Sequence, residues 1–429
     1  MRCVFFLLCW LLFMLPAAAR QNGLDVRIGK ALVSVTALRD DVLRVRIAPS
    51  GMLPADESWA ALPEARQASL AVRADGPHGF QTKSLTVRID PKSGALTVID
   101  PAGHEIVSGL GWHIRDKGFT LDLGLDPATH IFGLGDKMGP LDRRGRQFSL
   151  WNTDAFRFQE STDPLYKAIP FFTTLTGGRA TGLFLDDSFR TTFDFGASQP
   201  DRIEIGAAGG PIDLYLFAGP DPKAVLQAYA WLTGTPPLPP LWSFGFQQSR
   251  YGYKSDAEIR EVAERLRRDR IPADVIWFDI TVLDRDRAFT IDRANFPDFP
   301  KLVADLDAMG LRSVVINDLH LAAEPGYPPF DSGKAGDHFL KNPDGSIYVG
   351  KVWPGPSVFP DFTQAATRAW WGGLYDELYD RTGVAGFWND MNEPAVFETP
   401  GHTIPDSALP PASTMCWACC RPAPPMRGC

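Results

Sequence analysis

The residues best suited to chemistry follow an apolar run late in the sequence, within GFWNDMNEPAVF (386–397). Asp390, Asn392 and Glu393 stand directly behind residues 386–388, which have the character of a buried strand. Placing polar and charged side chains there costs free energy unless they have a partner or a purpose. A carboxylate in such a place suits attack on a carbon atom or the binding of a ligand's polar groups. Asp390 is therefore the centre of a candidate site.

Asp390 ends the last of four segments that we expect to be strands. Apolar strand signals lie over 241–249, 273–280, 312–320 and 384–393, and helical signals lie over 255–270, 300–310 and 363–383. This alternation predicts a parallel sheet covered by helices. Polar residues end every strand, namely Gln247 and Gln248, Asp279, Asn317 and Asp318, and Asp390. In a (β/α)₈ barrel the carboxyl ends of the strands form the active-site face, so we expect catalytic or ligand-binding residues there.

A barrel is favoured over a doubly wound sheet for this region. Both architectures bind ligands at the carboxyl ends of their strands, but no glycine-rich phosphate loop follows any of these four strands. A (β/α)₈ barrel closes with eight strands, so the sequence predicts the first half of one, about four βα units. Half a barrel leaves two parallel edges exposed.

The N-terminal half carries a different pattern, typical of a β-sandwich. Apolar and polar residues alternate over 32–49, 84–103 and 181–196, and DPKSG (90–94) is a hairpin turn between two such runs. Repeated short strands with such turns predict a sandwich of about 200 residues. A helical segment over 219–234 and the proline-rich TPPLPPL (235–241) mark the boundary with the second domain.

Composition narrows the class of partner. The 429 residues carry a net charge of −8, from 43 basic and 51 acidic residues, without a Lys/Arg block. This balance argues against a nucleic-acid partner. Aromatic residues make up 11%, including 12 tryptophans. They fit two interpretations, core filling or flat platforms for sugar rings.

The N-terminal residues MRCVFFLLCWLLFMLPAAAR (1–20) predict a secretory signal peptide. Arg2 precedes an apolar run over 3–15, and small residues end the segment. Cleavage is expected after Ala19, with export to the periplasm or the exterior. The run is too short for a comfortable membrane span, and a retained anchor is the alternative. After cleavage we expect no membrane association.

The cysteines lie only at the two ends of the chain. They are Cys3, Cys9, Cys416, Cys419, Cys420 and Cys429. An exported protein whose body has no cysteine depends on packing alone. The Pro/Cys-rich tail, 401–429, is expected to lie outside the fold, and translation in a shifted frame is one interpretation of it. A zinc site at the Cys-x-x-Cys of 416–419 is disfavoured, because no second pair or histidines lie nearby.

The segment around Asp390 resembles the nucleophile segment of glycoside hydrolase family 31, which contains α-glucosidases and α-xylosidases. Other motifs resemble that family in the same order: IFGLGDK (131–137), LWNTDAF (150–156), YGYKSDAEI (251–259), DVIWFDI (274–280), FPDFPKLVADLDAMGLR (296–312) and VWPGPSVFPDFT (352–363). The resemblance covers about residues 24–400. It implies a β-sandwich followed by a (β/α)₈ barrel and the retaining hydrolysis of an α-glycosidic bond.

The resemblance assigns a domain to each part of the chain. We expect a signal peptide over 1–19, a β-sandwich over 20–235, a partial catalytic barrel over 236–400 and the tail over 401–429. A retaining glycosidase needs a carboxylate nucleophile about 5–5.5 Å from a second carboxyl group that acts as acid and then base. An oligosaccharide or α-glycoside is the expected substrate. No metal or organic cofactor is expected, because carboxylate chemistry at carbon needs none.

The resemblance also assigns individual residues. Asp390 matches the nucleophile, and the substrate-binding positions are Asp154, Asp279, Trp353, Trp388 and Phe397. Asn392 and Glu393 are expected to support the loop by hydrogen bonding rather than to react. Each position also has a structural alternative: Asp390 as a turn cap, Asp279 as the N-cap of the following loop, and the aromatic residues as packing.

The sequence departs from the family's pattern near the sugar subsites. Thr281-Val282 replaces an acid and a tyrosine, Tyr251 replaces a tryptophan, and VINDLHLAAEPGY (315–327) differs from the commoner form. The family's acid/base carboxylate and a sugar-binding arginine and histidine lie on later strands, and nothing in 401–429 resembles them. We therefore expect a C-terminally truncated chain with weak activity or none. The competing interpretations are a catalytically dead carbohydrate-binding protein and a sandwich interaction module.

Overall fold

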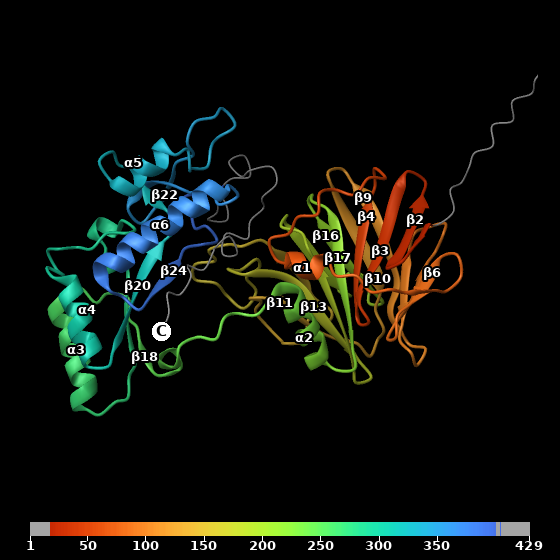
Figure 1. The fold of residues 1–429 in the computed structure, drawn as a ribbon, viewed down its shortest axis with the longest axis horizontal. Helices are drawn as coiled ribbons and strands as arrows, with labels where there is room; N and C mark the ends of the chain where they lie inside the picture. Colours follow the sequence, from red (N-terminus) through yellow and green to blue (C-terminus); the bar gives the residue numbers. More distant parts are fainter. Residues whose placement is uncertain (1–17, 400–403, 405–429) are drawn as a thin grey trace, which may run out of the picture.

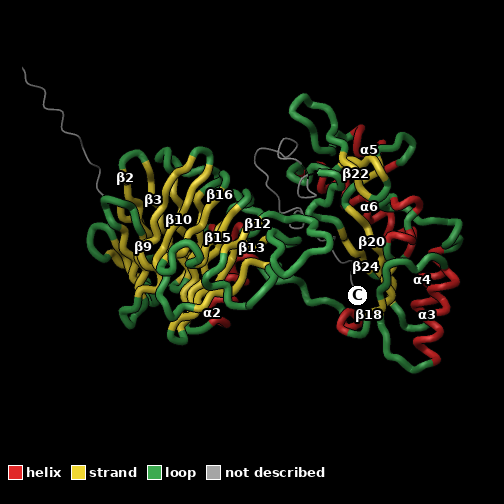
Figure 2. The backbone as a smooth tube through the Cα atoms, turned by 180° about the vertical axis from the view of Figure 1, so that it is seen from behind, coloured by secondary structure: helices red, strands yellow, loops and turns green. Residues whose placement is uncertain are grey.

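The structure, a computed structural model, describes residues 18–399 and 404, which form two bodies connected by the segment 234–246 (Figure 1). The first body consists mainly of strands, with the helix α2 (Pro222–Thr233) beside them, and the second mixes strands with several helices (Figure 2). Most of the predicted signal peptide and all but one residue of the 401–429 tail lie outside the described residues. Ala18 and Ala19, the last residues of that predicted peptide, pair with Asp25 and Leu24 as part of the strand β1.

Two sheets face each other in the first body. One has the strand order β1 (Ala18–Arg20), β2 (Gly23–Ile28), β3 (Ala31–Arg39), β4 (Val42–Ala48), β17 (Ile212–Gly219), β14 (Arg179–Leu185), β13 (Ala168–Thr176), β11 (His130–Gly135). The other has the order β12 (Gln147–Leu150), β15 (Thr191–Phe195), β16 (Arg202–Ala207), β10 (Gly118–Gly124), β9 (Glu105–Arg115), β8 (Leu96–Ile99), β7 (Thr86–Ile89), β6 (Gly79–Gln81), β5 (Arg73–Ala74). Every pairing in these sheets is antiparallel, as the alternating sequence pattern predicts.

The sandwich core follows directly from the sequence pattern. In β10 every second residue, Phe119, Leu121 and Leu123, is buried against the facing sheet. The strands β14 and β17 are buried on both faces instead, because the helix α2 (Pro222–Thr233) packs on their outer side through Val225 and its neighbours. Strands that are covered on two sides lose the alternating pattern, which is why 212–217 is apolar almost throughout.

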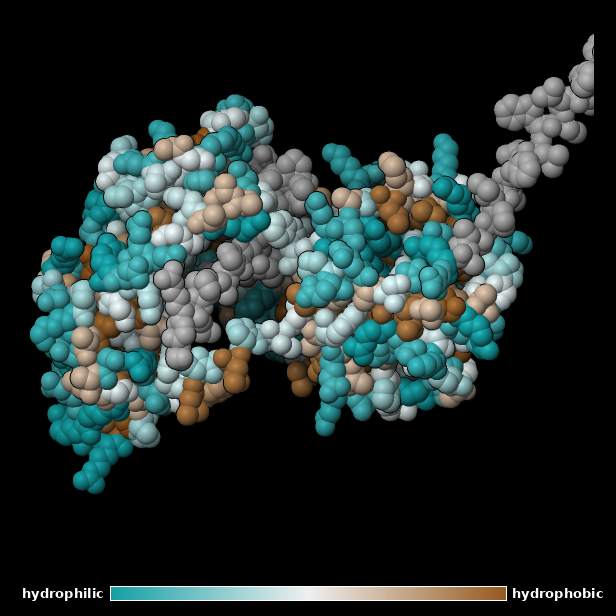
Figure 3. All heavy atoms as spheres, in the orientation of Figure 1, coloured by the Kyte–Doolittle hydropathy of each residue, from teal (hydrophilic) through white to brown (hydrophobic). Residues whose placement is uncertain are grey.

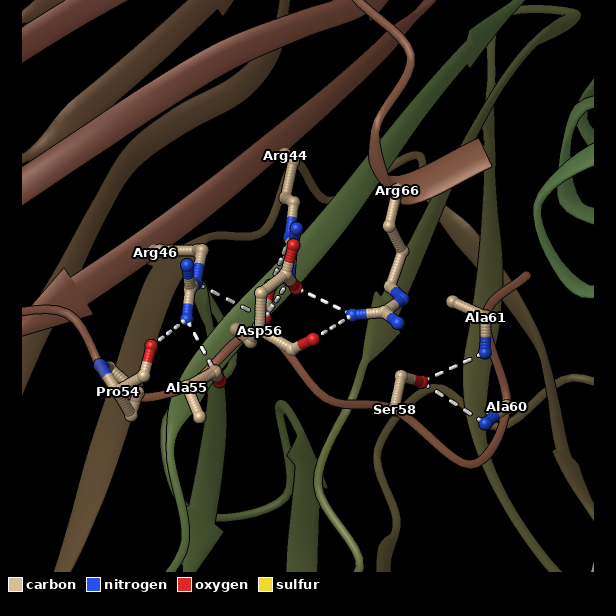
Figure 4. A network of polar contacts seen from close by, with 10 residues as sticks. Arg44, Arg46, Pro54, Ala55, Asp56, Ser58, Ala60, Ala61 and Arg66 are labelled. Atoms are coloured by element: carbon tan, nitrogen blue, oxygen red, sulfur yellow. Dashed lines mark hydrogen bonds and ion pairs between the residues drawn. The ribbon is translucent and has the colours of Figure 1, made fainter. Parts of the chain in front are cut away.

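A buried ion cluster secures the loop between β4 and the short helix α1 (Pro63–Arg66). Arg44 donates to both carboxylate oxygens of Asp213 at 2.9 and 2.6 Å and to Asp56 at 2.7 Å. Arg66 reaches the same Asp56 oxygen at 2.6 Å, and Figure 4 shows the two arginines converging on it. Arg44 and Asp213 are 5% and 4% exposed, so each charge depends on the other for compensation.

Replacement of Asp213 by asparagine should destabilise the sandwich by ~3 kcal/mol, because it leaves the Arg44 guanidinium buried with one carboxylate fewer. Urea unfolding followed by tryptophan fluorescence measures the change. The matched control is Asp337→Asn, which removes an exposed pair with Lys341 and should leave the unfolding midpoint unchanged. If the two substitutions lowered the free energy of unfolding equally, the burial of the Arg44–Asp213 pair would not explain its contribution to stability.

The second body is built on a parallel four-stranded sheet. Its order is β18 (Gln247–Gln248), β19 (Val275–Phe278), β20 (Arg312–Asp318), β24 (Gly386–Asp390). A small antiparallel sheet projects from it, in the order β21 (Leu321–Ala322), β23 (Gly355–Val358), β22 (Gly350–Val352). Within the described residues this is the predicted first half of a barrel.

Four helices accompany the strands in the described part of the second body. They are α3 (Asp256–Arg268), α4 (Phe299–Ala308), α5 (Pro328–Ala335) and α6 (Ala365–Thr382), with three 3₁₀ turns, η1 (Leu241–Phe244), η2 (Ile280–Val282) and η3 (Asp284–Asp286). Three of the helices, α3, α4 and α6, lie where the sequence predicts helices, whereas α5 was not predicted. Ser255 caps α3 by accepting the Glu258 amide at 3.3 Å, and Asp298 caps α4 by accepting the Lys301 amide at 3.1 Å. Apolar faces of α3 and α4 close over β19 and β20.

The first barrel strand is shorter than predicted. An extended segment was expected over 241–249, but residues 241–244 form η1 and only Gln247 and Gln248 pair with β19. Four prolines precede the segment, and within the described residues β18 has a partner on one side only. At Gly245 a Cβ would lie 1.7 Å from the Asp274 carboxylate, so a side chain there would displace the side chain of Asp274, the residue before β19.

One contact between the two bodies joins α6 to the loop before α1. The Arg368 guanidinium of α6 lies over the Trp59 ring, 5.4 Å from its centroid, so the loop held by Asp56 also contacts the barrel side. Large apolar side chains of the linker are exposed, among them Leu238, Leu241 and Phe244, and Figure 3 shows hydrophobic residues on the surfaces of both bodies. Among the helices described, none has the length and apolar character that a bilayer span requires.

Candidate active site

The candidate site lies where the parallel strands end. In the register of β20 and β24, Asp318 is the direct partner of Asp390, and Asn317 is the partner of Asn389. Neighbouring strands lie about 4.7–4.9 Å apart, so the two aspartates share one face at adjacent positions. Asp279 follows the last residue of β19, on the other side of β20. Three of the four strand ends thus place a carboxylate at the same edge.

Asp390 is half-buried among other acids. Burial raises the pKa of its carboxyl group, the backbone N–H of Met391 opposes this by hydrogen bonding, and the charge of Asp154 raises it further. Met391 has φ of 57°, a left-handed conformation that turns the chain sharply after the strand. The hydrogen bond from the Met391 amide is the turn cap that was the alternative interpretation of Asp390. The Asp390 carboxylate still interacts electrostatically with Asp154.

Asp279 is both a cap and a member of the acid group. Its side chain accepts the Ile280 amide at 2.6 Å and begins η2, as the structural alternative predicts. It is 8% exposed. Burial raises the pKa of Asp279, and the charge of Asp390 adds to the rise. The two interpretations of Asp279 are therefore compatible.

Asp318 is the most deeply buried acid of the site. Burial, followed by the charges of Asp390 and Asp279, raises its pKa to about 8. Neither of its carboxylate oxygens has a hydrogen-bond partner within the described part of the chain. In the sequence Asp318 stands out only as a polar strand end, although its signal equals that of Asp279.

Glu393 lies in the turn that follows β24, two residues after the left-handed Met391. Burial raises its pKa to about 7, and the charges of Asp154 and Asp390 act in the same direction. Asn392 is half-buried in the same turn. A carboxyl group with a pKa near neutrality can act as an acid or a base, so Glu393 has this second candidate role beside the loop support that the sequence predicts.

The sandwich contributes to this site through the loop between β12 and β13. Tyr166 of that loop hydrogen-bonds Asp154, and its pKa is raised by burial, then by Asp154, Glu393 and Asp390. These electrostatic contacts bring Asp154 of the first body to the carboxylates of the second. The sandwich loop therefore interacts with the strand-end acids through Asp154. Tyr166 takes part in the same interaction, although no feature of the sequence gave a reason to select it.

Two pairs of aromatic rings account for the predicted aromatic residues. Trp388 packs edge-to-face on Trp277, 5.9 Å between centroids, and the Trp277 indole donates to the Gln247 side chain at 2.8 Å. Trp388 is two residues before Asp390 on β24, and so on the same face. Trp353 and Phe397 meet edge-to-face at 5.2 Å beside the small sheet, where Trp353 is 46% exposed. The site residues thus fall into one acid group and two aromatic pairs.

Three residues that depart from the family pattern, Thr281, Val282 and Tyr251, differ in their contacts and exposure. Thr281 donates to the Tyr253 carbonyl at 2.5 Å, so its hydroxyl holds the chain after β18. Val282 is 1% exposed, whereas Tyr251 is 70% exposed. Within residues 18–399 and 404, no group of three or more His, Cys, Asp or Glu side chains is arranged to hold a metal ion.

A β-sandwich followed by parallel βα units with carboxylates at the strand ends is the arrangement of sandwich–barrel carbohydrate-active proteins. Residues 236–415 match the glycosyl hydrolases family 31 TIM-barrel domain, and residues 32–194 match the glycosyl hydrolase 31 N-terminal galactose mutarotase-like domain. The chain belongs to glycoside hydrolase family 31. The predicted fold class is confirmed, and α-glucosidases of this family are glycoside hydrolases that act on O-glycosyl bonds.

Relatives in sequence and structure agree with this assignment. The chain is 38% identical over 372 residues to alpha-glucosidase 2 of Bacillus thermoamyloliquefaciens, covering 85% of this chain and 47% of that protein. It is 34% identical to an alpha-glucosidase of Saccharolobus solfataricus, covering 69% and 43%. A Flavobacterium johnsoniae family 31 dextranase, solved with isomaltotriose, superposes with a TM-score of 0.82 at 27% identity, covering 88% and 47%. The chain thus spans about half the length of these relatives.

The free energy of unfolding should fall as the pH rises from about 4 to about 8, because Asp318 and Glu393 have folded-state pKa values of about 8 and about 7 against ~4 when unfolded. Between these pKa values the folded chain keeps protons on Asp318 and Glu393 that the unfolded chain releases. The stability that these protons contribute is complete below the pKa of each group in the unfolded chain, and it is lost as the pH rises through the pKa of that group in the folded chain. Each group contributes a slope of up to ~1.4 kcal/mol per pH unit within its window.

Urea unfolding at several pH values across this window measures the slope. Buried Asp186 and Asp187 act with the same sign in the sandwich, with pKa values of about 6 and about 7. Buried His320, whose pKa is lowered to about 3, acts with the opposite sign below pH ~6.5. Asp318→Asn is therefore needed to isolate the contribution of Asp318. That variant should have a shallower slope than the unmodified chain. An unchanged slope would show that Asp318 ionises normally in the folded protein.

Proposed function

We propose that this chain carries the nucleophile side of an α-glucosidase-like site that hydrolyses α-glycosidic bonds with retention, with Asp390 as the nucleophile. The observation that supports it is the register that sets Asp390 beside Asp318 at the carboxyl edge of a parallel sheet, with Asp154 of the sandwich in electrostatic contact. A nucleophilic carboxylate at this edge can attack the anomeric carbon of a sugar held between the two bodies.

The substrate class follows from the relatives and from the side chains present. The similar proteins are named alpha-glucosidases, and the dextranase was solved with isomaltotriose and with glucose. Asp154 and Asp279 can accept hydrogen bonds from sugar hydroxyl groups, and Trp388 presents a ring to the apolar face of a sugar. We assign these three residues to the sugar that is transferred to Asp390. Trp353 and Phe397 are assigned to the rim, where further sugar units would lie.

A second part of the proposal is that residues 18–399 hydrolyse an ordinary α-glycoside weakly or not at all. A retaining mechanism needs an acid on the side of the sugar ring opposite to the nucleophile. Glu393 has a suitable pKa, but it follows Asp390 by three residues in the same turn, and we therefore assign it to the nucleophile's side. Asn392 and Glu393 are assigned to the support of Asp390. The N-terminal pattern supports export as the destination of the protein.

Covalent trapping tests the role of Asp390. The chain is incubated with α-glucosyl fluoride, whose leaving group departs with little protonation, and the peptide that contains Asp390 is examined by mass spectrometry after acid quenching. A glucosyl adduct on this peptide is expected, and it should be absent from the Asp390→Asn variant. An adduct on another carboxylate would reassign the nucleophile.

A catalytically inactive carbohydrate-binding protein is the second candidate, and the exposed Trp353 ring favours it. It would bind the same sugars without forming an adduct. Quenching of tryptophan fluorescence by isomaltotriose, together with an absence of adduct in the trapping experiment, would select this candidate.

A further inference from the structure

His320 and Asp318 form a buried pair that lacks ordinary partners. Their side chains are 1% and 2% exposed, and Nε2 of His320 lies 3.5 Å from Oδ2 of Asp318. Within the described residues, both ring nitrogens and both carboxylate oxygens are without a hydrogen bond. Buried polar atoms nearly always have partners, so four unpaired atoms on two side chains in contact require an explanation.

The explanation has to account for charge as well as hydrogen bonding. Burial lowers the pKa of His320 to about 3, and it raises the pKa of Asp318 to about 8. Burial therefore favours the neutral form of each group taken alone. Moving one proton from Oδ2 of Asp318 to Nε2 of His320 creates an ion pair without changing the net charge of the pair. The attraction of opposite charges at this separation offsets part of the cost of burying them.

The charges that face Asp318 decide between the two arrangements. After burial, Asp390, Asp279, Asp286 and Glu393 raise its pKa, in that order. Asp390 is its register partner on the adjacent strand. For His320, burial is the cause of the shift. Removing the negative charge of Asp390 thus favours the carboxylate form of Asp318, and His320 is the base within reach of the released proton.

We propose that His320 is the proton acceptor for Asp318, so that the two side chains hold one proton whose position follows the charge on Asp390. While Asp390 is a carboxylate, the O–H bond of Asp318 is intact and His320 is neutral. When Asp390 loses its charge, that O–H bond breaks, an N–H bond forms on Nε2 of His320, and Asp318 becomes a carboxylate. His320 is a positioning residue in this scheme, because it acts through Asp318.

The proton transfer between Asp318 and His320 would assist catalysis if Asp390 is the nucleophile, as the proposed function states. Formation of a glycosyl ester on Asp390 removes that residue's charge. The proton transfer would then restore a negative charge next to the sugar, at Asp318, while the ester is present. A negative charge at that place stabilises the positive character that develops at the anomeric carbon when the ester breaks.

The test follows the protonation of His320 by the ¹⁵N chemical shifts of its ring in the full 429-residue chain, with Asp ¹³Cγ labels reporting on Asp318. Asp390→Asn mimics the uncharged nucleophile. Near neutral pH the unmodified chain should show neutral His320 and protonated Asp318, and the variant should show imidazolium and carboxylate. His320→Gln and Asp318→Asn assign the two resonances.

His338 is the matched control, since it is also buried but hydrogen-bonds Thr367 at 3.1 Å, and its shift should be the same in both proteins. If Asp390→Asn does not fold, Asp279→Asn removes another charge that acts on Asp318 and should move the His320 titration in the same direction by a smaller amount. A neutral His320 in every folded variant would overturn the proposal. That outcome would reject the proton transfer from Asp318 to His320 only. The trapping experiment decides separately whether Asp390 is the nucleophile.

Discussion

Replacement of Asp390 by asparagine should reduce fluoride release from α-glucosyl fluoride by ~10⁴-fold or more, the usual cost of removing a residue that acts as the nucleophile. The amide cannot form the glycosyl ester, while the neighbouring acids remain in place. Added azide should partly restore turnover by attacking the same face of the sugar, with β-glucosyl azide as the product. Product configuration is measured by proton NMR.

Asp376→Asn is the control for this substitution. Asp376 is an exposed residue on α6, so the same replacement of an aspartate by an asparagine is made away from the site. Its rate should equal that of the unmodified chain. Retention of more than about a tenth of the rate by Asp390→Asn, against the ~10⁴-fold loss expected for a nucleophile, would remove Asp390 from the mechanism.

Ordinary disaccharides should be hydrolysed by residues 1–429 far below ~1–10³ s⁻¹, the range of typical enzymes. General acid catalysis contributes ~10²–10⁴-fold, and an alkoxide leaving group needs it more than fluoride does. The ratio of the rates on α-glucosyl fluoride and on maltose or isomaltose measures this deficit. A glucose assay on the disaccharides and fluoride release provide the two rates.

Glu393→Gln decides the meaning of any disaccharide activity. If Glu393 acts as the acid, the variant should lose activity on disaccharides and keep it on the fluoride. If Glu393 only supports the turn, both rates should change together. Activity in the enzymatic range that survives Glu393→Gln would mean that another acid of the chain protonates the leaving group.

Local signals predicted most of the fold. The helical signals over 255–270 and 300–310 predicted α3 and α4, and in the structure Ser255 and Asp298 accept amide hydrogens that the helix starts leave unpaired. Alternation over 84–103 predicted β7 and β8, where every second residue is buried. The pattern was less informative for 241–249, because periodicity in a short apolar run does not distinguish a strand from a helical turn such as η1.

The site was predictable where residues follow the strands and less so where partners come from elsewhere. Asp279 and Asp390 stand out as acids behind apolar runs. Asp318 has the same signal, yet its proximity to Asp390 depends on the register of β20 and β24, which the sequence does not state. The roles of Tyr166 and His320 depend on contacts across the tertiary structure, so no local pattern could assign them.

Under the proposed function, the electrostatic interaction of Asp154 and Tyr166 with the strand-end acids would make the sandwich a separate determinant of ligand choice. The loop between β12 and β13 is anchored at both ends in antiparallel strands, so its tip can vary without disturbing the packing of the parallel sheet. Exchange of residues 151–167 for the corresponding loop of a relative would alter one wall of the site and leave Asp390 and its strand intact. Selectivity can therefore change through the sandwich loop independently of the catalytic residues on the barrel strands.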